Sequence, residues 1–121
     1  MVEITRVLLL LKNMVYESTS PQETLRFAKY YRKKGLDVVV VLWGPMGVLL
    51  GKKKKHGSPA YDDYVLECLN IGVKFKSCRM ACSMIGICEE DFLEGIEIVE
   101  SFVVAEMFLE YQKEGQLIIS L

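Results

Sequence analysis

Short, unbroken blocks of aliphatic residues recur along the chain and alternate with segments of helical periodicity. Continuous apolar blocks of this length are typical of strands buried on both faces, as in parallel sheets. Strands that alternate with helices place those helices on both faces of the sheet. We therefore expect one α/β domain over residues 1–121, a three-layer α/β/α arrangement with a mostly parallel five-stranded sheet. The predicted strands are residues 4–12, 36–43, 73–77, 96–98 and 117–120.

Helix start and stop signals separate these strands. Ser20-Pro21 with Glu23 predicts a helix that Ser20 caps, because this spacing forms a capping box. Ser58-Pro59 predicts a second start of the same kind, and glycine follows the expected helix ends. The apolar face of this second helix is predicted to contain Tyr61, Tyr64, Val65, Cys68 and Leu69. The predicted helices are residues 20–34, 48–55, 58–70, 79–85 and 99–113.

The charge of the chain is split between its two halves. The formal net charge is −1, but residues 1–60 carry a net of +7 and residues 61–121 a net of −8. The near-neutral total argues against a dedicated nucleic-acid-binding protein, which shows a basic balance. Because both halves contribute strands to one sheet, we expect copies of the chain to pack with basic and acidic regions in contact.

The apolar segments are also too short for a membrane protein. The longest uncharged stretch, residues 38–51, is interrupted by glycine and proline, whereas a spanning helix needs about 20 apolar residues. The N-terminal apolar block is likewise too short for a signal peptide. We expect a cytoplasmic protein whose four cysteines are thiols rather than a disulfide framework.

Three of the four cysteines lie close together, at positions 78, 82 and 88. Cys78 directly follows a predicted buried strand and precedes a predicted helix, which places it at the edge of the sheet where α/β proteins bind ligands. A side chain there meets the free N–H groups and the positive dipole end of the helix. Arg79 adds a positive charge beside it. These features favour a nucleophilic thiolate at Cys78.

Such a thiolate is compatible with several chemistries. It can accept a sulfane sulfur as a persulfide, react with peroxide, form a disulfide or ligate a metal. Cys82 shares a helical face with Cys78 and is a candidate resolving or accessory thiol, although a disulfide within one turn requires local unwinding. A zinc-type site from the three clustered cysteines and His56 lacks the tight Cys-x2-Cys spacing. Cys68 and Cys88 are predicted to be structural.

Other residues near the predicted strand ends complete the candidate site. Asn13, Trp43 and Gly44 lie at the carboxyl ends of the first two predicted strands and are expected to line a pocket with Cys78 and Arg79. The basic run at residues 52–55 does not form a phosphate-binding loop, because Met46 and a lysine occupy the positions that require glycine and Ser/Thr. It is interpreted as a solvated loop, or alternatively as a dock for an anion or partner.

The segment GVKFKSCRMACSMIGICEEDFLEGIEIV, residues 72–99, resembles the DsrE/DsrF-like family of small sulfur-relay proteins. Upstream, Leu42-Trp43-Gly44 is similar to the Phe-Trp-Gly segment of a DsrE-like subfamily. The shared features are Gly72-Val73, Cys78, Gly86-Ile87, the acidic turn at 89–93, Gly95-Ile96, and upstream Leu49-Leu50 and Lys52.

The resemblance implies a flavodoxin-like α/β/α fold, homo- or hetero-oligomers such as trimers or hexamers, and a persulfide carried on Cys78. It implies sulfur donor and acceptor proteins as partners. We expect neither a cofactor nor a metal, although Cys82 and Cys88 leave room for redox or metal chemistry in place of relay. The leading hypothesis is therefore a sulfur carrier or sulfurtransferase of an intracellular relay. The alternatives are a non-enzymatic assembly module with inert thiols and a cysteine-ligated metal or redox module.

Overall fold

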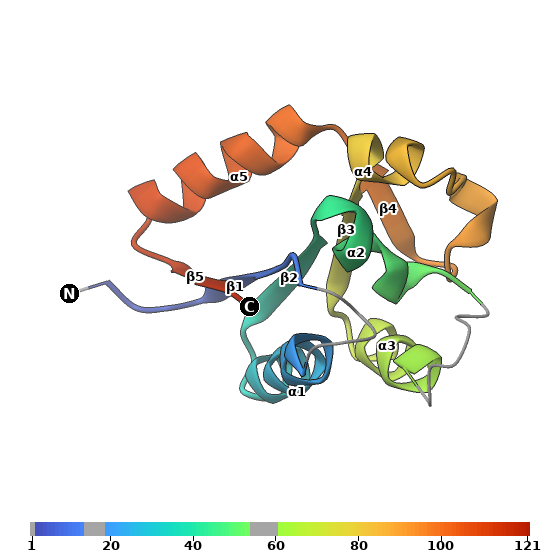
Figure 1. Cartoon of the computed structure of the whole chain (residues 1–121). Helices are drawn as coiled ribbons and strands as arrows, with labels where there is room; N and C mark the ends of the chain where they lie inside the picture. The colour runs from blue at the N-terminus through green and yellow to red at the C-terminus, as the bar shows by residue number, and fades with distance from the viewer. Residues whose placement is uncertain (1, 14–18, 54–60) are drawn as a thin grey trace.

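Five parallel strands form one sheet at the centre of the molecule (Figure 1). The computed structural model describes residues 2–13, 19–53 and 61–121. Neighbouring strands follow the order β4-β3-β2-β1-β5, and every pair is parallel. The predicted α/β class and five-stranded parallel sheet are confirmed. The strands are β1 (Arg6–Leu11), β2 (Asp37–Leu42), β3 (Lys74–Cys78), β4 (Ile96–Val99) and β5 (Leu117–Ser120).

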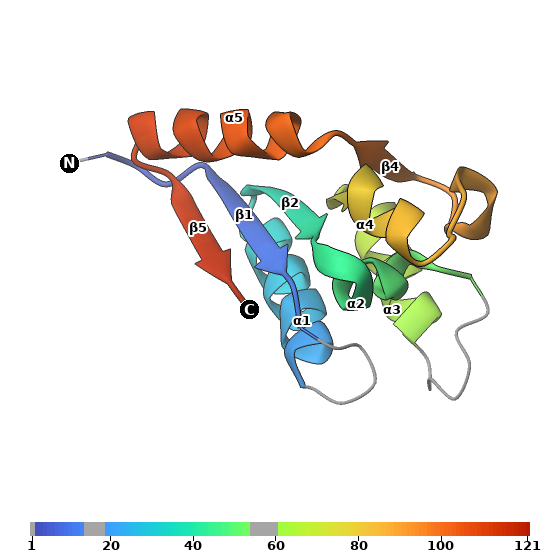
Figure 2. The ribbon, with the colours of Figure 1, turned by 45° about the horizontal axis from the view of Figure 1, so that its top comes forward.

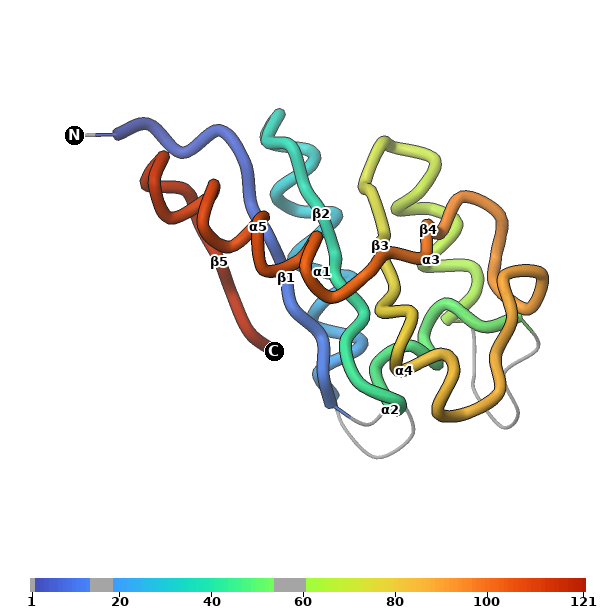
Figure 3. Tube along the Cα trace, turned by 90° about the horizontal axis from the view of Figure 1, so that it is seen from above, coloured from blue at the N-terminus to red at the C-terminus, as the bar shows by residue number. Residues whose placement is uncertain are grey.

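Helices cover both faces of this sheet. Two of them, α1 and α3, pack on one face, and α5 alone crosses the other from the β4 edge to the β5 edge (Figures 1 and 3). Three short helical segments, α2, η1 and α4, lie at the carboxyl ends of β2 and β3 (Figure 2). The helical segments are α1 (Ser20–Lys33), α2 (Gly44–Val48), η1 (Leu49–Gly51), α3 (Tyr61–Asn70), α4 (Arg79–Met84), η2 (Glu89–Asp91) and α5 (Ser101–Lys113).

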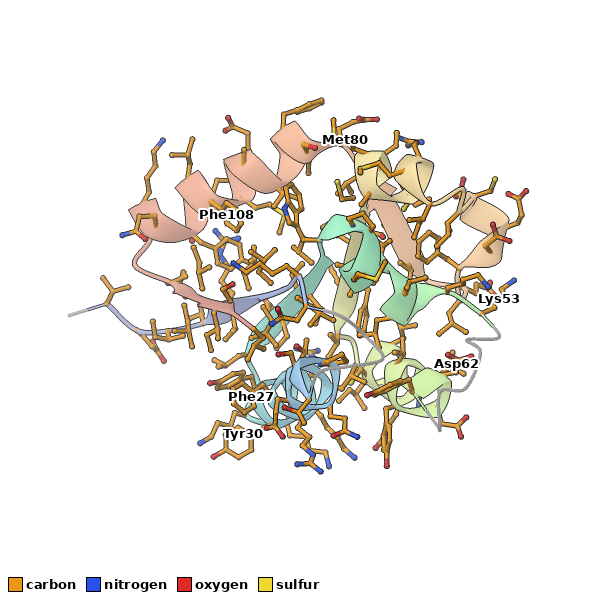
Figure 4. The ribbon with its side chains drawn as sticks, in the orientation of Figure 1. Phe27, Tyr30, Lys53, Asp62, Met80 and Phe108 are labelled. Carbon is orange, nitrogen blue, oxygen red and sulfur yellow. The ribbon has the colours of Figure 1, made fainter. Side chains whose placement is uncertain are left out.

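The continuous valine run of β2 explains the three layers. Successive side chains of a strand point to opposite faces. Val38 and Val40 therefore join the larger core under α1 and α3, whereas Val39 and Val41 join the smaller core under α5. Phe108 of α5 packs against this smaller core from above (Figure 4). No helix among the described residues is long and apolar enough to cross a lipid bilayer.

The chain between β2 and α3 departs from the prediction. A helix was expected over residues 48–55, but α2 already begins at Gly44 and η1 ends at Gly51, after which Lys52 bridges to Phe92. Gly44 has a φ of +75°, which turns the chain out of β2, and Pro45 in the first turn favours a helix start at this point. The remainder of this segment, residues 54–60, lies outside the described residues.

Gly47 fixes the close approach of α2 to the end of β1. A Cβ at this position would lie 2.6 Å from the backbone oxygen of Leu11, so only glycine fits. Because β1 and β2 are neighbours, this contact holds α2 over the carboxyl ends of the strands.

Three smaller predictions are also wrong. Thr19, not Ser20, is the N-cap residue of α1, and it makes no side-chain capping bond. The Ser20 hydroxyl accepts a hydrogen bond from the Asn13 amide at 3.1 Å. Tyr64 is exposed rather than part of the apolar face of α3, and α5 begins at Ser101 because residue 99 still belongs to β4.

Candidate functional site

Cys78 is the last residue of β3 and the N-cap residue of α4. Its side chain is buried, with 5% of the residue exposed. The Sγ atom lies 3.8 Å from the hydroxyl oxygen of Ser101, the first residue of α5. The sheet register pairs Cys78 with Val99 of β4, and this pairing brings the start of α5 to the thiol.

Two helix starts therefore converge on one sulfur atom. The first N–H groups of a helix have no intrahelical acceptor and carry a positive partial charge. The starts of α4 and of the 13-residue helix α5 both lie at Cys78, whose side chain makes no capping hydrogen bond to α4, and the Ser101 hydroxyl lies within hydrogen-bonding distance of its sulfur.

Arg79 makes an ion pair that joins the two helix starts. Its Nε atom lies 2.6 Å from the Glu100 carboxylate, and both side chains are about half exposed. Glu100 is the N-cap residue of α5. The positive charge that the sequence places beside Cys78 is thus shared with a carboxylate, and the pair links α4 to α5 at the outer surface.

Cys82 is buried and interacts with a different hydroxyl. Its Sγ atom lies 3.6 Å from the Ser77 hydroxyl, and burial raises the pKa of the Cys82 thiol above its ordinary value. Ser77 and Cys78 are successive residues of β3, so their side chains diverge. The two thiols, although they are four residues apart, therefore have separate hydroxyl partners.

The two remaining cysteines occupy contrasting environments. Cys68 is buried between α3 and α1, where its thiol lies 3.7 Å from the Leu25 carbonyl oxygen, and burial raises its pKa to about 11. Cys88 is exposed at the start of η2, and its backbone N–H donates to the Asp91 carboxylate at 2.8 Å.

The other predicted site residues lie along the same edge of the sheet. Leu42 pairs with Ser77, so Trp43 and Cys78 lie at the ends of neighbouring strands. Trp43 is half-buried, and its backbone N–H donates to the Leu11 carbonyl oxygen at 2.8 Å. Asn13 follows β1, one strand further away, and is exposed. A pocket shared by these residues and Cys78 stays a prediction.

Metal coordination has no supporting cluster in the described ranges. Within residues 2–13, 19–53 and 61–121, no three His, Cys, Asp or Glu side chains are grouped as ligands. His56, the fourth ligand considered from the sequence, lies outside these ranges.

The sequence did not indicate Ser101 as the neighbour of the Cys78 thiol, nor Glu100 as the ion-pair partner of Arg79. Both lie more than 20 residues after Cys78, at the point where β4 ends. The end of β4 could have indicated them, since the carboxyl ends of parallel strands share one edge of a sheet.

Comparison with known structures identifies the same fold in three solved proteins. The chain superimposes on the YchN protein of E. coli with a TM-score of 0.80, at 22% identity, over 98% of this chain and 100% of that one. A protein of unknown function from Methanobacterium thermoautotrophicum gives a TM-score of 0.70 at 23% identity, over 96% of this chain and 98% of that one. A conserved protein of unknown function from Bacteroides thetaiotaomicron gives 0.68 at 20% identity, over 95% and 94%.

Sequence comparison adds a relative and a family. An uncharacterised protein of Methanopyrus kandleri is 36% identical over 76 residues, which span 61% of this chain and 62% of that protein. Residues 5–121 match the DsrE/DsrF-like family. This match covers all five strands and both helix starts at Cys78, and on these grounds the chain belongs to the DsrE/DsrF-like family.

Proposed function

We propose that this protein is a sulfur carrier in which Cys78 holds a persulfide. The observation that carries the proposal is the position of the Cys78 thiol, beside the Ser101 hydroxyl and at the meeting point of two helix starts. Anionic sulfur is stabilised by hydrogen-bond donors and by the positive end of helix dipoles. The link between the DsrE/DsrF-like family and sulfur relay supports the same conclusion.

The proposed loading step is a thiol–persulfide exchange. The Cys78 thiolate attacks the outer sulfur of a donor persulfide, R–S–SH. A new S–S bond forms to Cys78, and the S–S bond within the donor breaks. The inner sulfur of the donor leaves as the thiolate R–S⁻ and takes up a proton. The new persulfide on Cys78 loses its own proton. One sulfur atom is transferred without a net change in oxidation state, so the step requires no cofactor.

The partners of this step are a sulfur donor and a sulfur acceptor protein. We propose that the protein acts in the cytoplasm as a homo-oligomer, in which the charged faces of neighbouring copies meet. In α1, four of the charged residues are basic and one is acidic. On the other face of the sheet, α5 and its two flanking residues contain four acidic residues and one basic residue.

Mass spectrometry of the intact protein tests the proposed function. After exposure to inorganic polysulfide, we expect an added mass of about 32 Da, one sulfur atom, which a reductant removes. Cys78→Ala should abolish this species. Cys88→Ala is the matched control, because it removes the exposed thiol and should leave the sulfur on Cys78. Equal labelling of the wild type and Cys78→Ala would contradict the proposal and favour a non-enzymatic assembly module.

A further inference from the structure

The β3 strand places a charged side chain on the same face as Cys78. Successive side chains of a strand point to opposite faces, so Lys76 and Cys78 share the face of β3 that is turned towards α5. The sheet register pairs Cys78 with Val99 of β4, and it pairs Lys76 with Glu97 of the same strand. Lys76 and Glu97 therefore form the row of side chains next to the thiol, about 7 Å away along the strands.

The ammonium group of Lys76 is largely withdrawn from water. The Lys76 side chain is 19% exposed and donates a hydrogen bond to the Glu97 carboxylate at 2.8 Å. The Glu97 side chain is 62% exposed, so water reaches this carboxylate. A cation that is withdrawn from water needs a negative partner, whereas an exposed carboxylate is hydrated without one. Glu97 can therefore leave Lys76 when another anion takes its place.

Low exposure distinguishes Lys76 from the other charged groups around the thiol. Arg79 of α4 and Glu100, which precedes α5, pair with each other at the outer surface and are about half exposed. The short helix α2 packs against α4 and contains no charged residue. The remaining titratable neighbour is the buried thiol of Cys82. Lys76 is thus the cation beside Cys78 whose charge water screens least.

A groove beside α5 connects Lys76 with the surroundings of the thiol. It has a volume of about 430 Å³ and lies between α5 and the first part of β3, which α5 leaves uncovered (Figure 3). Lys76 and Phe102 both line this groove, and Phe102 follows Ser101, whose hydroxyl contacts the Cys78 sulfur. An S–S bond is about 2 Å long, so a persulfide extends by that length beyond Sγ. The groove offers space for this second sulfur atom on the side of Lys76.

We propose that Lys76 holds the outer sulfur of the Cys78 persulfide, exchanging its ion pair with Glu97 for one with the persulfide anion. This inference rests on the proposed function of Cys78. The loading step described above leaves a deprotonated persulfide, and charge-assisted hydrogen bonds to such an anion are strong where water is largely excluded. The exchange makes and breaks no covalent bond, and it leaves the Glu97 carboxylate to water. Its effect is to retain the sulfur on the protein.

An exchange equilibrium measures how strongly the protein retains the sulfur. The Cys88→Ala protein, which lacks the exposed thiol, is mixed with glutathione persulfide and glutathione at a fixed ratio. Intact mass spectrometry gives the fraction with one added sulfur, and hence the exchange constant. Lys76→Met in this background should lower the constant about tenfold, because the persulfide loses a hydrogen bond from a charged group. Lys76→Arg keeps the charge and should restore most of the loss.

Glu97→Gln supplies the opposite change. It removes the carboxylate that competes for Lys76 and should raise the exchange constant, whereas an ion pair with a purely structural role would give a decrease in both variants. Because Glu97 is exposed, this variant should also leave the fold intact. Lys74→Met is the matched control, since Lys74 lies on the same face of β3 but is exposed and four residues from Cys78. Its exchange constant should equal that of the parent protein.

The outcomes separate the role of Lys76 from the proposed function. If inorganic polysulfide does not load wild-type Cys78, the proposed function fails and the role of Lys76 fails with it. If polysulfide loads Cys78 but Lys76→Met leaves the exchange constant unchanged, only the role of Lys76 is overturned. A decrease in both Lys76→Met and Glu97→Gln, or an equal decrease in Lys74→Met, overturns it in the same way.

Discussion

The Cys78 sulfur lies 3.8 Å from the Ser101 hydroxyl oxygen, although 23 residues separate the two in the chain. Two structural features produce this contact. The β3–β4 register pairs Cys78 with Val99, and α5 begins two residues after Val99. The environment of the thiol is thus formed by the end of β3 and by the start of α5, the helix that follows the neighbouring strand β4.

Replacing Ser101 should slow sulfur loading of Cys78. A hydrogen bond to a charged group contributes about 1.5–3 kcal/mol, so Ser101→Ala should reduce the loading rate by about 10- to 100-fold. Stopped-flow measurement with polysulfide over a range of pH provides the rates. Ser83→Ala is the control, because Ser83 is an exposed serine of α4. Equal rates in the two variants would show that the Ser101 hydroxyl does not act on the sulfur.

Cys82 should behave as a core residue rather than as a resolving thiol. Burial raises its pKa, and a protonated thiol is a poor nucleophile in disulfide exchange. We expect no Cys78–Cys82 disulfide after mild peroxide treatment, measured by peptide mapping under non-reducing conditions. Cys82→Ala should lower the free energy of unfolding by about 1–3 kcal/mol, because the buried Ser77 hydroxyl loses its partner. Rapid formation of the disulfide would instead support a resolving role.

The buried Cys68 thiol should make the fold less stable at alkaline pH. Burial raises its pKa from 9.0 to about 11, so between these values the folded protein keeps a proton that the unfolded chain has released. Folding therefore becomes less favourable as the pH rises, by about 2–3 kcal/mol in total at most. Below pH 9 this contribution is fully present.

Urea unfolding at pH 8 and pH 10.5, under reducing conditions, measures this effect. Cys68→Ala should lose less stability than the wild type between the two pH values, and Cys88→Ala should match the wild type. Burial also raises the pKa values of Tyr111 and Cys82, but both residues are present in all three proteins. The role of Cys68 is therefore read from the difference in pH dependence between the three proteins. If the stability of Cys68→Ala changed with pH as much as that of the wild type, the Cys68 thiol would not be the source of the alkaline destabilisation.

The strands were predictable because short, continuous apolar runs bounded by turn signals are typical of strands buried on both faces. The run Val38–Val41 consists of β-branched residues and is apolar on both faces, which suits a strand covered on two sides. Their exact ends were not predictable in the same way. Val99 fits equally well at the end of a strand or at the start of a helix, and its pairing with Cys78 decides the outcome.

The position of Cys78 was predictable from the sequence, whereas the residues that surround it were not. Its place at the edge of the sheet follows from a local pattern, a strand followed directly by a helix. The Cys78–Ser101 contact and the Arg79–Glu100 ion pair depend on which strand lies beside β3, and strand order is set by the whole fold. The start of α2 at Gly44 was not predicted, because the helix was expected only from residue 48, whereas the positive φ of Gly44 and Pro45 in the first turn lead directly from β2 into α2.

Assembly of the protein should depend on salt. The basic face formed by α1 and the acidic face formed by α5 lie on opposite sides of the sheet, so one copy can contact the next through unlike charges (Figure 1). Such a contact joins unlike surfaces of the two copies, and it closes into a ring, such as the trimer or hexamer that the family resemblance implies, only when the rotation between copies closes. Long-range attraction between the faces is screened beyond about 10 Å at 0.1 M salt.

Light scattering at low and high salt measures this dependence. We expect the average mass to fall as the salt concentration rises, and we expect Lys33→Glu, a charge reversal on the exposed surface of α1, to lower the mass already at low salt. Lys113→Glu, at the far end of the acidic face, is the matched control, because adding negative charge there strengthens the proposed contact. An oligomer whose mass is insensitive to salt and to both variants would have an apolar interface, with both charged faces left free.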